Sequence, residues 1–351
     1  MTGTSTIVQA GGTALGVDTH KDVNVAFAID HLGRRVDERR APTTESGSND
    51  LLRWARQLGP DRIWGIEGTG SYGAGLTRVL QAAGETVHEV SRPNRRVRRN
   101  RGKSDPIDAE VAARNVLAGQ VEGAPRAGTG VVEALRQLRA TRRSALKART
   151  QAANLLRALL LTAPDDIRAE LDRGSLKDIV QRCTRLRPGP VSQEREACRF
   201  ALRAAARRWR HLAEEISELD IPIAELTAQA APALLDQFGV GPDVAAALLI
   251  AAGGNPERLG HEASFAALCG VSPIPASSGK TNRHRLNRGG DRQANCALHT
   301  VAMVRMRSDP RTRAYVARRT SEGLSSKEIK RCIKRYIARE LYPLIVAGLT
   351  G

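Results

Sequence analysis

Apolar positions in the first 90 residues fall into short runs separated by polar turns and amphipathic stretches. The short runs predict strands over 13–18, 23–29, 62–67 and 86–90, with a possible further strand over 34–40. The amphipathic stretches predict helices over 51–58 and 76–83. Because three antiparallel-type strands come before an alternation of helices and strands, we predict an α/β fold with helices packed on one sheet.

Apolar residues between 131 and 230 follow helical spacing. They predict two long helices joined by residues 162–189, and Pro222 should kink the second helix. A heptad seam on that helix consists of Trp209, Leu212, Ile216, Leu219, Ile223 and Leu226. Two interpretations stay open. One is a coiled-coil arm that joins protomers and turns a basic stripe toward nucleic acid, and the other is an ordinary helical hairpin with a solvated basic face.

The segment 231–351 is predicted to be mainly helical. Residues 234–245 resemble a helix-hairpin-helix, whose glycines let backbone amides approach a phosphate, although a plain helical turn is the alternative. Further helices are predicted over 263–269, 297–306 and 327–344. In the last helix, the apolar side is formed by Ile329, Ile333, Ile337 and Leu341, and the exposed basic side is expected to hold Lys330, Lys334 and Arg335.

Composition points to a polyanionic partner. The chain has 351 residues, of which 41% are apolar, and its net charge is +18. This length suggests two or three domains, which we place at 1–123, 124–230 and 231–351. No apolar run is long enough to span a bilayer, and no signal-peptide pattern is present. Five scattered cysteines without a C-x-x-C motif favour a reducing compartment, with neither a disulfide framework nor a zinc site. Nucleic acid in the cytoplasm is therefore the expected partner.

Four carboxylates stand at positions that favour a site over packing. Asp18 and Glu67 each end a predicted strand, and Asp105 and Asp108 share one face of the first turn of a predicted helix that begins around Pro106. Taken singly, the helical pair could be a cap that complements the helix dipole, and the strand-end acids could belong to turns. Taken together, four such acids can converge on Mg²⁺, which prefers hard oxygen ligands.

Two basic segments lie where they can hold phosphates, although a charge run is often only a solvated face. The first leads into the predicted acidic helix and contains Arg92, Arg95, Arg96, Arg98, Arg99, Arg101 and Lys103, with no acid among them. The second is a loop rich in serine and glycine that contains Lys280, Arg283, Arg285 and Arg288. Both segments are candidate nucleic-acid-binding regions.

The placement of the four acids resembles the RuvC-like, DEDD-type domain of the IS one-ten family of insertion-sequence transposases, also called bridge-RNA-guided recombinases. The segments Gly16–Lys21 and Lys103–Ala109 match that family's pattern closely. The resemblance covers nearly the whole chain. It implies an RNase H/RuvC-like N-terminal domain, a helical coiled-coil linker and a mainly helical C-terminal transposase domain. It also implies that Asp18, Glu67, Asp105 and Asp108 are the catalytic, Mg²⁺-binding residues.

The same resemblance extends to the serine-rich loop. In the family, a serine before a glycine is the nucleophile, which corresponds to Ser278 before Gly279, with Ser277 as the adjacent alternative. The resemblance implies a transient covalent phosphoserine link to DNA, strand exchange without free ends, and sites assembled from different protomers of a dimer or tetramer. The chain departs from the family at Ala294-Asn295, where many members carry a leucine–arginine pair.

The expected function is thus that of a transposase, a Mg²⁺-dependent DNA recombinase that joins donor and target DNA. Only 3% of the residues are aromatic, which makes extensive base stacking improbable and is consistent with a guide (bridge) RNA that selects the sites. We expect action in the bacterial cytoplasm at the nucleoid. Two rivals remain: a RuvC-like structure-specific nuclease in which water attacks, and a non-enzymatic basic scaffold that bridges nucleic acids.

Overall fold

The computed structural model describes residues 8–90, 105–121, 123–254, 259–277 and 284–350. The chain divides into two compact units. The first consists of Met1–Thr129 with the short stretch Gly253–Arg258, and the second consists of Gly130–Ala252 and Leu259–Gly351. The helices predicted for 124–230 and those predicted for 231–351 thus belong largely to one unit, and the three-domain division stays a prediction.

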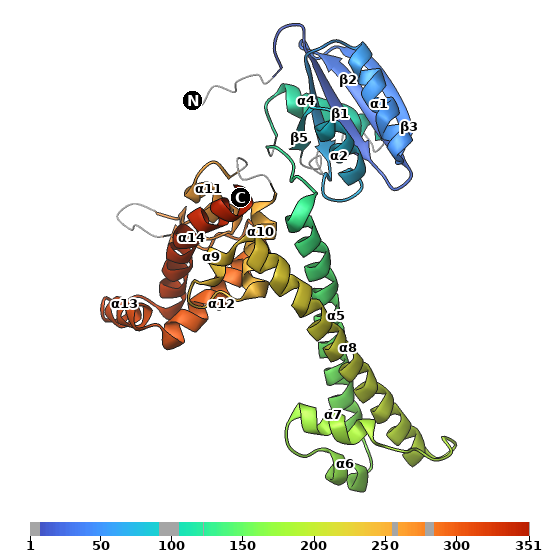
Figure 1. Cartoon of the computed structure of the whole chain (residues 1–351), viewed down its shortest axis with the longest axis vertical. Coiled ribbons are helices and arrows are strands. Elements are labelled where there is room, and N and C mark those ends of the chain that lie inside the picture. The colour runs from blue at the N-terminus through green and yellow to red at the C-terminus, as the bar shows by residue number, and fades with distance from the viewer. Residues whose placement is uncertain (1–7, 91–104, 122, 255–258, 278–283, 351) are drawn as a thin grey trace. The chain divides into compact units, whose positions relative to one another are not determined.

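A five-stranded mixed sheet forms the centre of the first unit (Figure 1). Its strands are β1 (Thr13–Thr19), β2 (Val23–Asp30), β3 (Arg35–Pro42), β4 (Arg62–Glu67) and β5 (Thr86–Val90). They lie in the order β3-β2-β1-β4-β5. The first three strands pair antiparallel, whereas β4 runs parallel to both β1 and β5. The mixed α/β prediction is confirmed, and each strand lies within two residues of its predicted bounds.

Helices cover both faces of this sheet. The helices α1 (Glu45–Gln57) and α2 (Ala74–Ala82) pack on the face that carries Leu15, Val17 and Ile66. The helix α4 (Asp105–Leu117) packs on the opposite face, against Ala14 and Phe27. Because side chains alternate along a strand, every second residue of β1 and β4 faces α4. This alternation decides which polar residues at the strand ends meet α4.

Two glycines let α4 lie unusually close to the sheet. Gly16 of β1 and Gly65 of β4 are register partners in neighbouring strands. A Cβ atom built on Gly16 would lie 2.1 Å from the carbonyl oxygen of Ala109, and one on Gly65 would lie 2.4 Å from a methyl carbon of Val116. A larger side chain at either position would push the helix away. The glycine pair therefore sets the distance between α4 and the strands beneath it.

Among its described residues, the regular structure of the second unit is helical except for one short hairpin. Its helices are α5 (Gly130–Leu161), α6 (Asp165–Leu171), α7 (Leu176–Thr184), α8 (Glu194–Ala230), α9 (Pro232–Leu235), α10 (Pro242–Ala252), α11 (Glu262–Leu268), α12 (Arg292–Ser308), α13 (Pro310–Ser321) and α14 (Ser326–Thr350). The hairpin pairs β6 (Ile274–Pro275) with β7 (His284–Arg285). The mainly helical prediction is confirmed. No helix in the described ranges is both long and apolar enough to cross a membrane.

The long helices α5 and α8 pack against each other within one chain (Figure 1). The helix α8 continues through Pro222, and Ile216 and Ile223 of the predicted seam are buried. A separate small core forms where α6 and α7 join the ends of the two long helices. This pairing inside one chain is what the helical-hairpin interpretation requires. A protomer-joining role for the same helices stays a prediction.

The C-terminal helices surround α10, most of whose residues are buried. The segment compared with a helix-hairpin-helix contains the short helix α9, a turn with Gly239 at a φ of 84°, and the start of α10. In α14, Ile329, Ile333 and Ile337 are buried, as predicted. The prediction that Lys334 is exposed is wrong. It is only 8% exposed because α14 packs against α10, α11 and α12 over a wide arc.

Candidate metal centre and nucleic-acid interface

Two of the predicted acids lie at adjacent strand ends on the face covered by α4. Asp18 lies two residues after Gly16, and Glu67 lies two residues after Gly65. Side chains two apart in a strand share a face, so both carboxylates are on the α4 side of the sheet. The partners Val17 and Ile66 immediately precede them in neighbouring parallel strands. The strand register therefore brings Asp18 and Glu67 together.

The other two predicted acids lie in the first turn of α4, above these strand ends. Asp105 is half-buried, whereas Asp108 is only 6% exposed. Burial raises the pKa of Asp18, His20 lowers it, and the negative charges of Glu67 and Asp108 raise it further. Carboxylates this close repel one another when ionised, and a cation relieves that repulsion. The helix-cap interpretation explains the acids in α4, but it does not explain the acids at the strand ends.

A histidine that sequence reasoning did not assign to the site joins the two groups of acids. His20 Nε2 lies 3.0 Å from Asp18 Oδ2 and 3.3 Å from Asp105 Oδ1. One ligand atom from each of these three residues lies within 4.8 Å of the others, a spacing that suits one metal ion. The sequence feature that could have identified His20 as a site residue is its position two residues after Asp18, which puts both side chains on the same side of the strand end.

The chemistry of the donor set fits a divalent cation. Four carboxylates offer hard oxygen atoms, which Mg²⁺ prefers, and Asp18 and Asp108 are largely shielded from water. An imidazole is a poor ligand for Mg²⁺ but a good hydrogen-bond donor to carboxylates. His20 therefore fits best as the residue that holds Asp18 and Asp105 in place.

The loop rich in serine and glycine, residues 273–290, is called the serine segment and belongs to the second unit. Ser277 is exposed just after β6, whereas Ser278, Lys280 and Arg283 lie outside the described residues. The register pairs Pro275 with His284, so β6 and β7 bring the two flanks of the serine segment together. Of the loop cations, Arg285 and Arg288 are described, and both are exposed.

The base of this segment is closed by backbone contacts. A Cβ atom on Gly290, whose φ is 85°, would lie 2.5 Å from the backbone nitrogen of Gly270, so the two chain segments nearly touch. The side-chain amide of Asn295 donates hydrogen bonds to the carbonyl oxygens of Cys269 and Gly270, at 2.8 and 3.2 Å. Asn295 is the departure from the family pattern noted above. It holds the turn at the end of α11, shortly before the serine segment.

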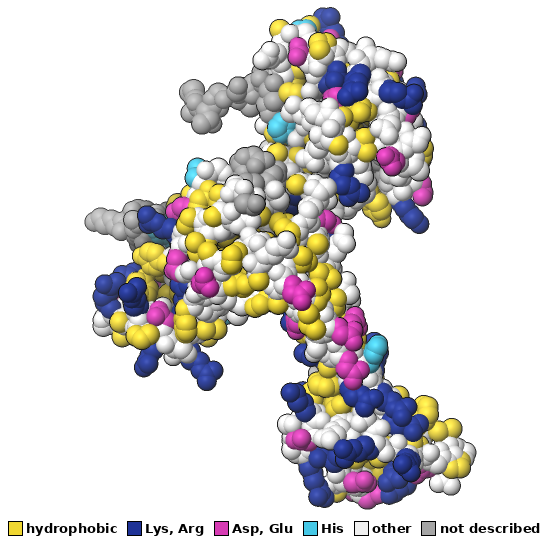
Figure 2. All heavy atoms as spheres, viewed as in Figure 1, with side chains coloured by type: hydrophobic (Ala, Val, Ile, Leu, Met, Phe, Trp, Pro, Cys, Tyr) yellow, Lys and Arg dark blue, Asp and Glu magenta, His cyan; other side chains and the backbone are white. Residues whose placement is uncertain are grey.

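Basic side chains on α13 form a surface that the candidate sites had not included. Figure 2 shows dark blue side chains crowded over this helix. They are Arg311, Arg313, Arg318 and Arg319. Their spacing was visible in the sequence, but nothing there placed Arg319 in one cavity with Arg285. The basic run with Arg92, Arg95, Arg96, Arg98, Arg99, Arg101 and Lys103 lies outside the described residues.

Comparison with known proteins gives two family matches and a relative. The family model DEDD_Tnp_IS110, described as "Transposase", matches residues 15–163, and the model described as "Transposase IS116/IS110/IS902 family" matches residues 231–317. The "Insertion element IS900 uncharacterized 42 kDa protein" of Mycobacterium paratuberculosis is 25% identical over an alignment that covers 88% of this chain and 89% of the relative. The first match contains all four acids and the second contains the serine segment, so the chain belongs to the IS110 (IS one-ten) family of transposases, enzymes that cut and recombine DNA.

Proposed function

We propose that this transposase is a site-specific recombinase in which Mg²⁺-binding carboxylates and a serine nucleophile cleave and exchange DNA strands under the direction of a guide (bridge) RNA. The observation that carries the proposal is the convergence of Asp18 and Asp105 on His20, with Asp108 and Glu67 beside them. The strand order β3-β2-β1-β4-β5, with acids at the ends of β1 and β4, supports an RNase H/RuvC-like assignment for the first unit.

Asp18, Glu67, Asp105 and Asp108 are the residues that would hold the metal. A bound Mg²⁺ supplies stabilisation of the charge that develops on a phosphodiester during cleavage. The protein contributes the orientation of the ligands. Paired glycines bring α4 onto the sheet, and His20 joins the end of β1 to the start of α4. Fixed oxygen ligands in a partly dry site interact more strongly with a cation than freely hydrated ones.

Ser278 is the proposed nucleophile, with Ser277 as its neighbour and alternative. Its Oγ would form a bond to phosphorus while the bond from phosphorus to one deoxyribose oxygen breaks. The serine hydroxyl gives up its proton, and the departing sugar oxygen takes one up. The sugar hydroxyl of a second strand then reverses both changes and releases the serine. Because one phosphate ester replaces another at each step, strands can be exchanged without an energy-rich cofactor.

Site selection by RNA and assembly into a dimer or tetramer complete the proposal. With 3% aromatic residues and a net charge of +18, the chain is suited to gripping phosphates and helix shape more than to stacking on many bases. A guide RNA that pairs with donor and target would supply the sequence choice. Sites composed of acids from one protomer and serine from another would make recombination depend on assembly.

Strand exchange between a donor and a target DNA, with the guide RNA and Mg²⁺ present, tests the proposal. Asp108→Asn, which keeps the shape of the side chain, and Ser278→Ala should each abolish recombination, while Ser277→Ala should be milder. Metal-dependent cleavage that persists in Ser278→Ala would favour the nuclease in which water attacks. Binding without any metal-dependent cleavage by the unaltered chain would favour the scaffold.

A further inference from the structure

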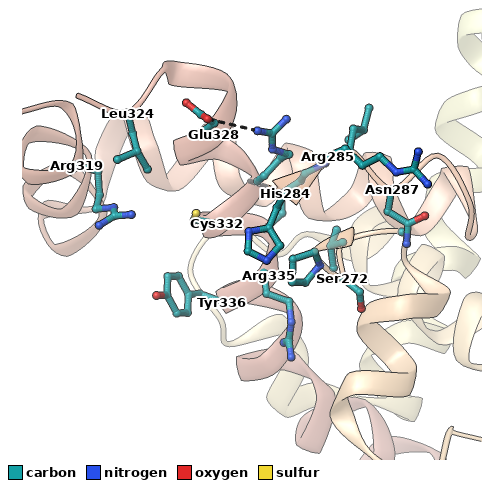
Figure 3. A pocket seen from close by; sticks show the side chains of 16 residues that line it. Ser272, His284, Arg285, Asn287, Arg319, Leu324, Glu328, Cys332, Arg335 and Tyr336 are labelled. Carbon is teal, nitrogen blue, oxygen red and sulfur yellow. Dashed lines mark ion pairs between the residues drawn. The ribbon is translucent and has the colours of Figure 1, made fainter. Parts of the chain in front are cut away.

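A basic cavity of about 720 Å³ lies between the β6–β7 hairpin and α14 in the second unit. Figure 3 shows its walls: His284 and Arg285 from the hairpin, Arg319 from α13, and Arg335 and Tyr336 from α14. Its volume falls within the range of pockets that hold small organic ligands, and it exceeds what a lone phosphate needs. A ligand in this cavity would touch three elements of the transposase unit.

The positive charges that line the cavity are only partly balanced by acids. Five lining side chains are arginine or lysine, and Glu328 is the one carboxylate among the lining residues. Three of the cations have acidic partners: Arg331 lies 3.9 Å from Glu328, Arg335 lies 2.6 Å from Glu262, and Arg319 pairs with Glu322. Within the described part of the chain, Arg285 and Lys334 have no ion pair. The cavity thus retains an excess of positive charge.

Lys334 is the more unusual of these two residues. It is 8% exposed, and its Nζ atom donates one hydrogen bond, at 2.9 Å, to Oδ1 of Asn295. An ammonium group has three N–H donors, and an unpaired buried charge is unfavourable. Burial and the nearby Arg331 lower the pKa of Lys334. A phosphate oxygen would complete its hydrogen bonds and neutralise its charge.

Tyr336 adds an aromatic surface to the same cavity. It is 57% exposed, although a large apolar ring is usually better covered. Its ring centroid lies 5.8 Å from that of Tyr315, and the two rings form a T-shaped pair. Exposed aromatic rings beside cations are typical of surfaces on which unpaired bases stack. The neighbouring α13 arginines continue the positive surface.

We propose that this cavity holds one nucleotide of an unpaired nucleic-acid strand, with its phosphate beside Arg285 and Lys334 and its base against Tyr336. The inference rests on the proposed function, because it assigns the cavity to the strand on which that function acts. The link to chemistry is Asn295, which accepts a hydrogen bond from Lys334 and donates to the carbonyls of Cys269 and Gly270 at the end of α11, shortly before the serine segment. An occupied cavity would therefore hold the base of the serine segment in place.

The test is equilibrium binding by the full chain, measured as fluorescence anisotropy with a labelled single-stranded DNA, an RNA of the same sequence and a DNA duplex. The buffer contains a chelator, so no cleavage occurs and failure of the serine mechanism cannot affect the result. Arg285→Gln and Lys334→Met should each lower the slope of log affinity against log salt by about 0.7 for single strands. Tyr336→Ala should weaken single-strand binding roughly 5- to 150-fold while leaving the slope and duplex binding unchanged.

Lys327→Gln is the matched control, because Lys327 is an exposed cation on α14 that does not line the cavity. Slopes for Arg285→Gln and Lys334→Met that equal the control slope would overturn the proposal. So would a Tyr336→Ala variant that binds single strands normally or loses duplex affinity equally. If Lys334→Met has a lower melting temperature than the unaltered protein, its slope is set aside and the slope of the exposed Arg285→Gln variant tests the proposal. A larger effect with DNA or with RNA identifies which strand supplies the nucleotide.

Discussion

His20 Nε2 lies 3.3 Å from Oδ1 of Asp105, so an imidazole–carboxylate contact joins the end of β1 to the start of α4. The same nitrogen lies 3.0 Å from Asp18 Oδ2. A single side chain thus contacts acids that are 87 residues apart in the sequence. The imidazole therefore joins the two acids in the metal-free protein.

His20→Ala should make the protein more dependent on divalent metal. Without the imidazole, repulsion among the acids should lower metal-free stability by about 0.2–1 kcal/mol, a small value because His20 is half exposed. Metal binding relieves that repulsion, so the rise in melting temperature on adding Mg²⁺ should be larger than in the unaltered protein. The measurement is thermal unfolding with and without Mg²⁺. Loss of the metal-induced rise would instead identify His20 as a required ligand.

Gly16→Ala should disturb the site through packing alone. The new methyl group would lie 2.1 and 2.2 Å from backbone atoms of Ala109 and Ala113, which can relax only if α4 moves away from the sheet. We expect a loss of about 1–3 kcal/mol in urea unfolding, together with reduced cleavage. Gly75→Ala is the matched control, because nothing lies within 4 Å of a Cβ atom there and alanine favours its helix α2. Equal stability of the two variants would show that α4 is not held at the distance described.

Asp18 gives the site a pH dependence with a defined sign. Its pKa is raised by burial, so the folded state holds the proton more tightly than the unfolded chain does. The stabilising effect of this proton is complete below the ordinary aspartate pKa and is lost as pH rises through the raised value. Asp18→Asn should therefore raise the metal-free melting temperature at neutral pH and abolish cleavage.

Metal must displace the same proton, so the affinity for metal should increase as pH rises through the raised pKa of Asp18. Titration calorimetry with Mg²⁺ at a series of pH values checks this expectation. An affinity that is independent of pH from the ordinary aspartate range to neutrality would remove Asp18 from the ligand set.

The two long helices allow a direct test of assembly. Ile221 on α8 is 61% exposed, whereas Ile216 is buried inside the chain. If α8 joins protomers, Ile221→Asp should reduce the particle mass measured by light scattering without loss of stability. Ile216→Asp should instead destabilise the chain itself, because it buries an unpaired charge. An unchanged mass for Ile221→Asp would place assembly elsewhere.

The regular elements could be predicted because their apolar spacing is strong. The short apolar runs of β1 and β2, and the spacing of Ile329, Ile333 and Ile337 in α14, predicted the correct type of element. The acids Asp18 and Glu67 were identifiable because polar residues at the ends of buried strands are poorly placed for packing. In these cases the local pattern and the tertiary environment agree.

The remaining features depend on which elements become neighbours. The close approach of α4 at Gly16 and Gly65 requires the strand register, and a lone glycine in a strand does not predict it. The sequence pattern predicts that Lys334 is an exposed lysine on an amphipathic helix. In the structure, it donates a hydrogen bond to Asn295 on a different helix. His20 likewise contacts Asp105 only because α4 packs against the sheet, which the local sequence does not predict.

Mapping the covalent bond between protein and DNA tests the serine mechanism itself. Full-length protein, guide RNA, Mg²⁺ and target DNA should give a covalent adduct that mass spectrometry locates at Ser278. Ser278→Ala should give no adduct, and Ser277→Ala should retain it. Cleaved DNA without any adduct, or an adduct that forms as readily with Ser278→Ala, would contradict the serine mechanism.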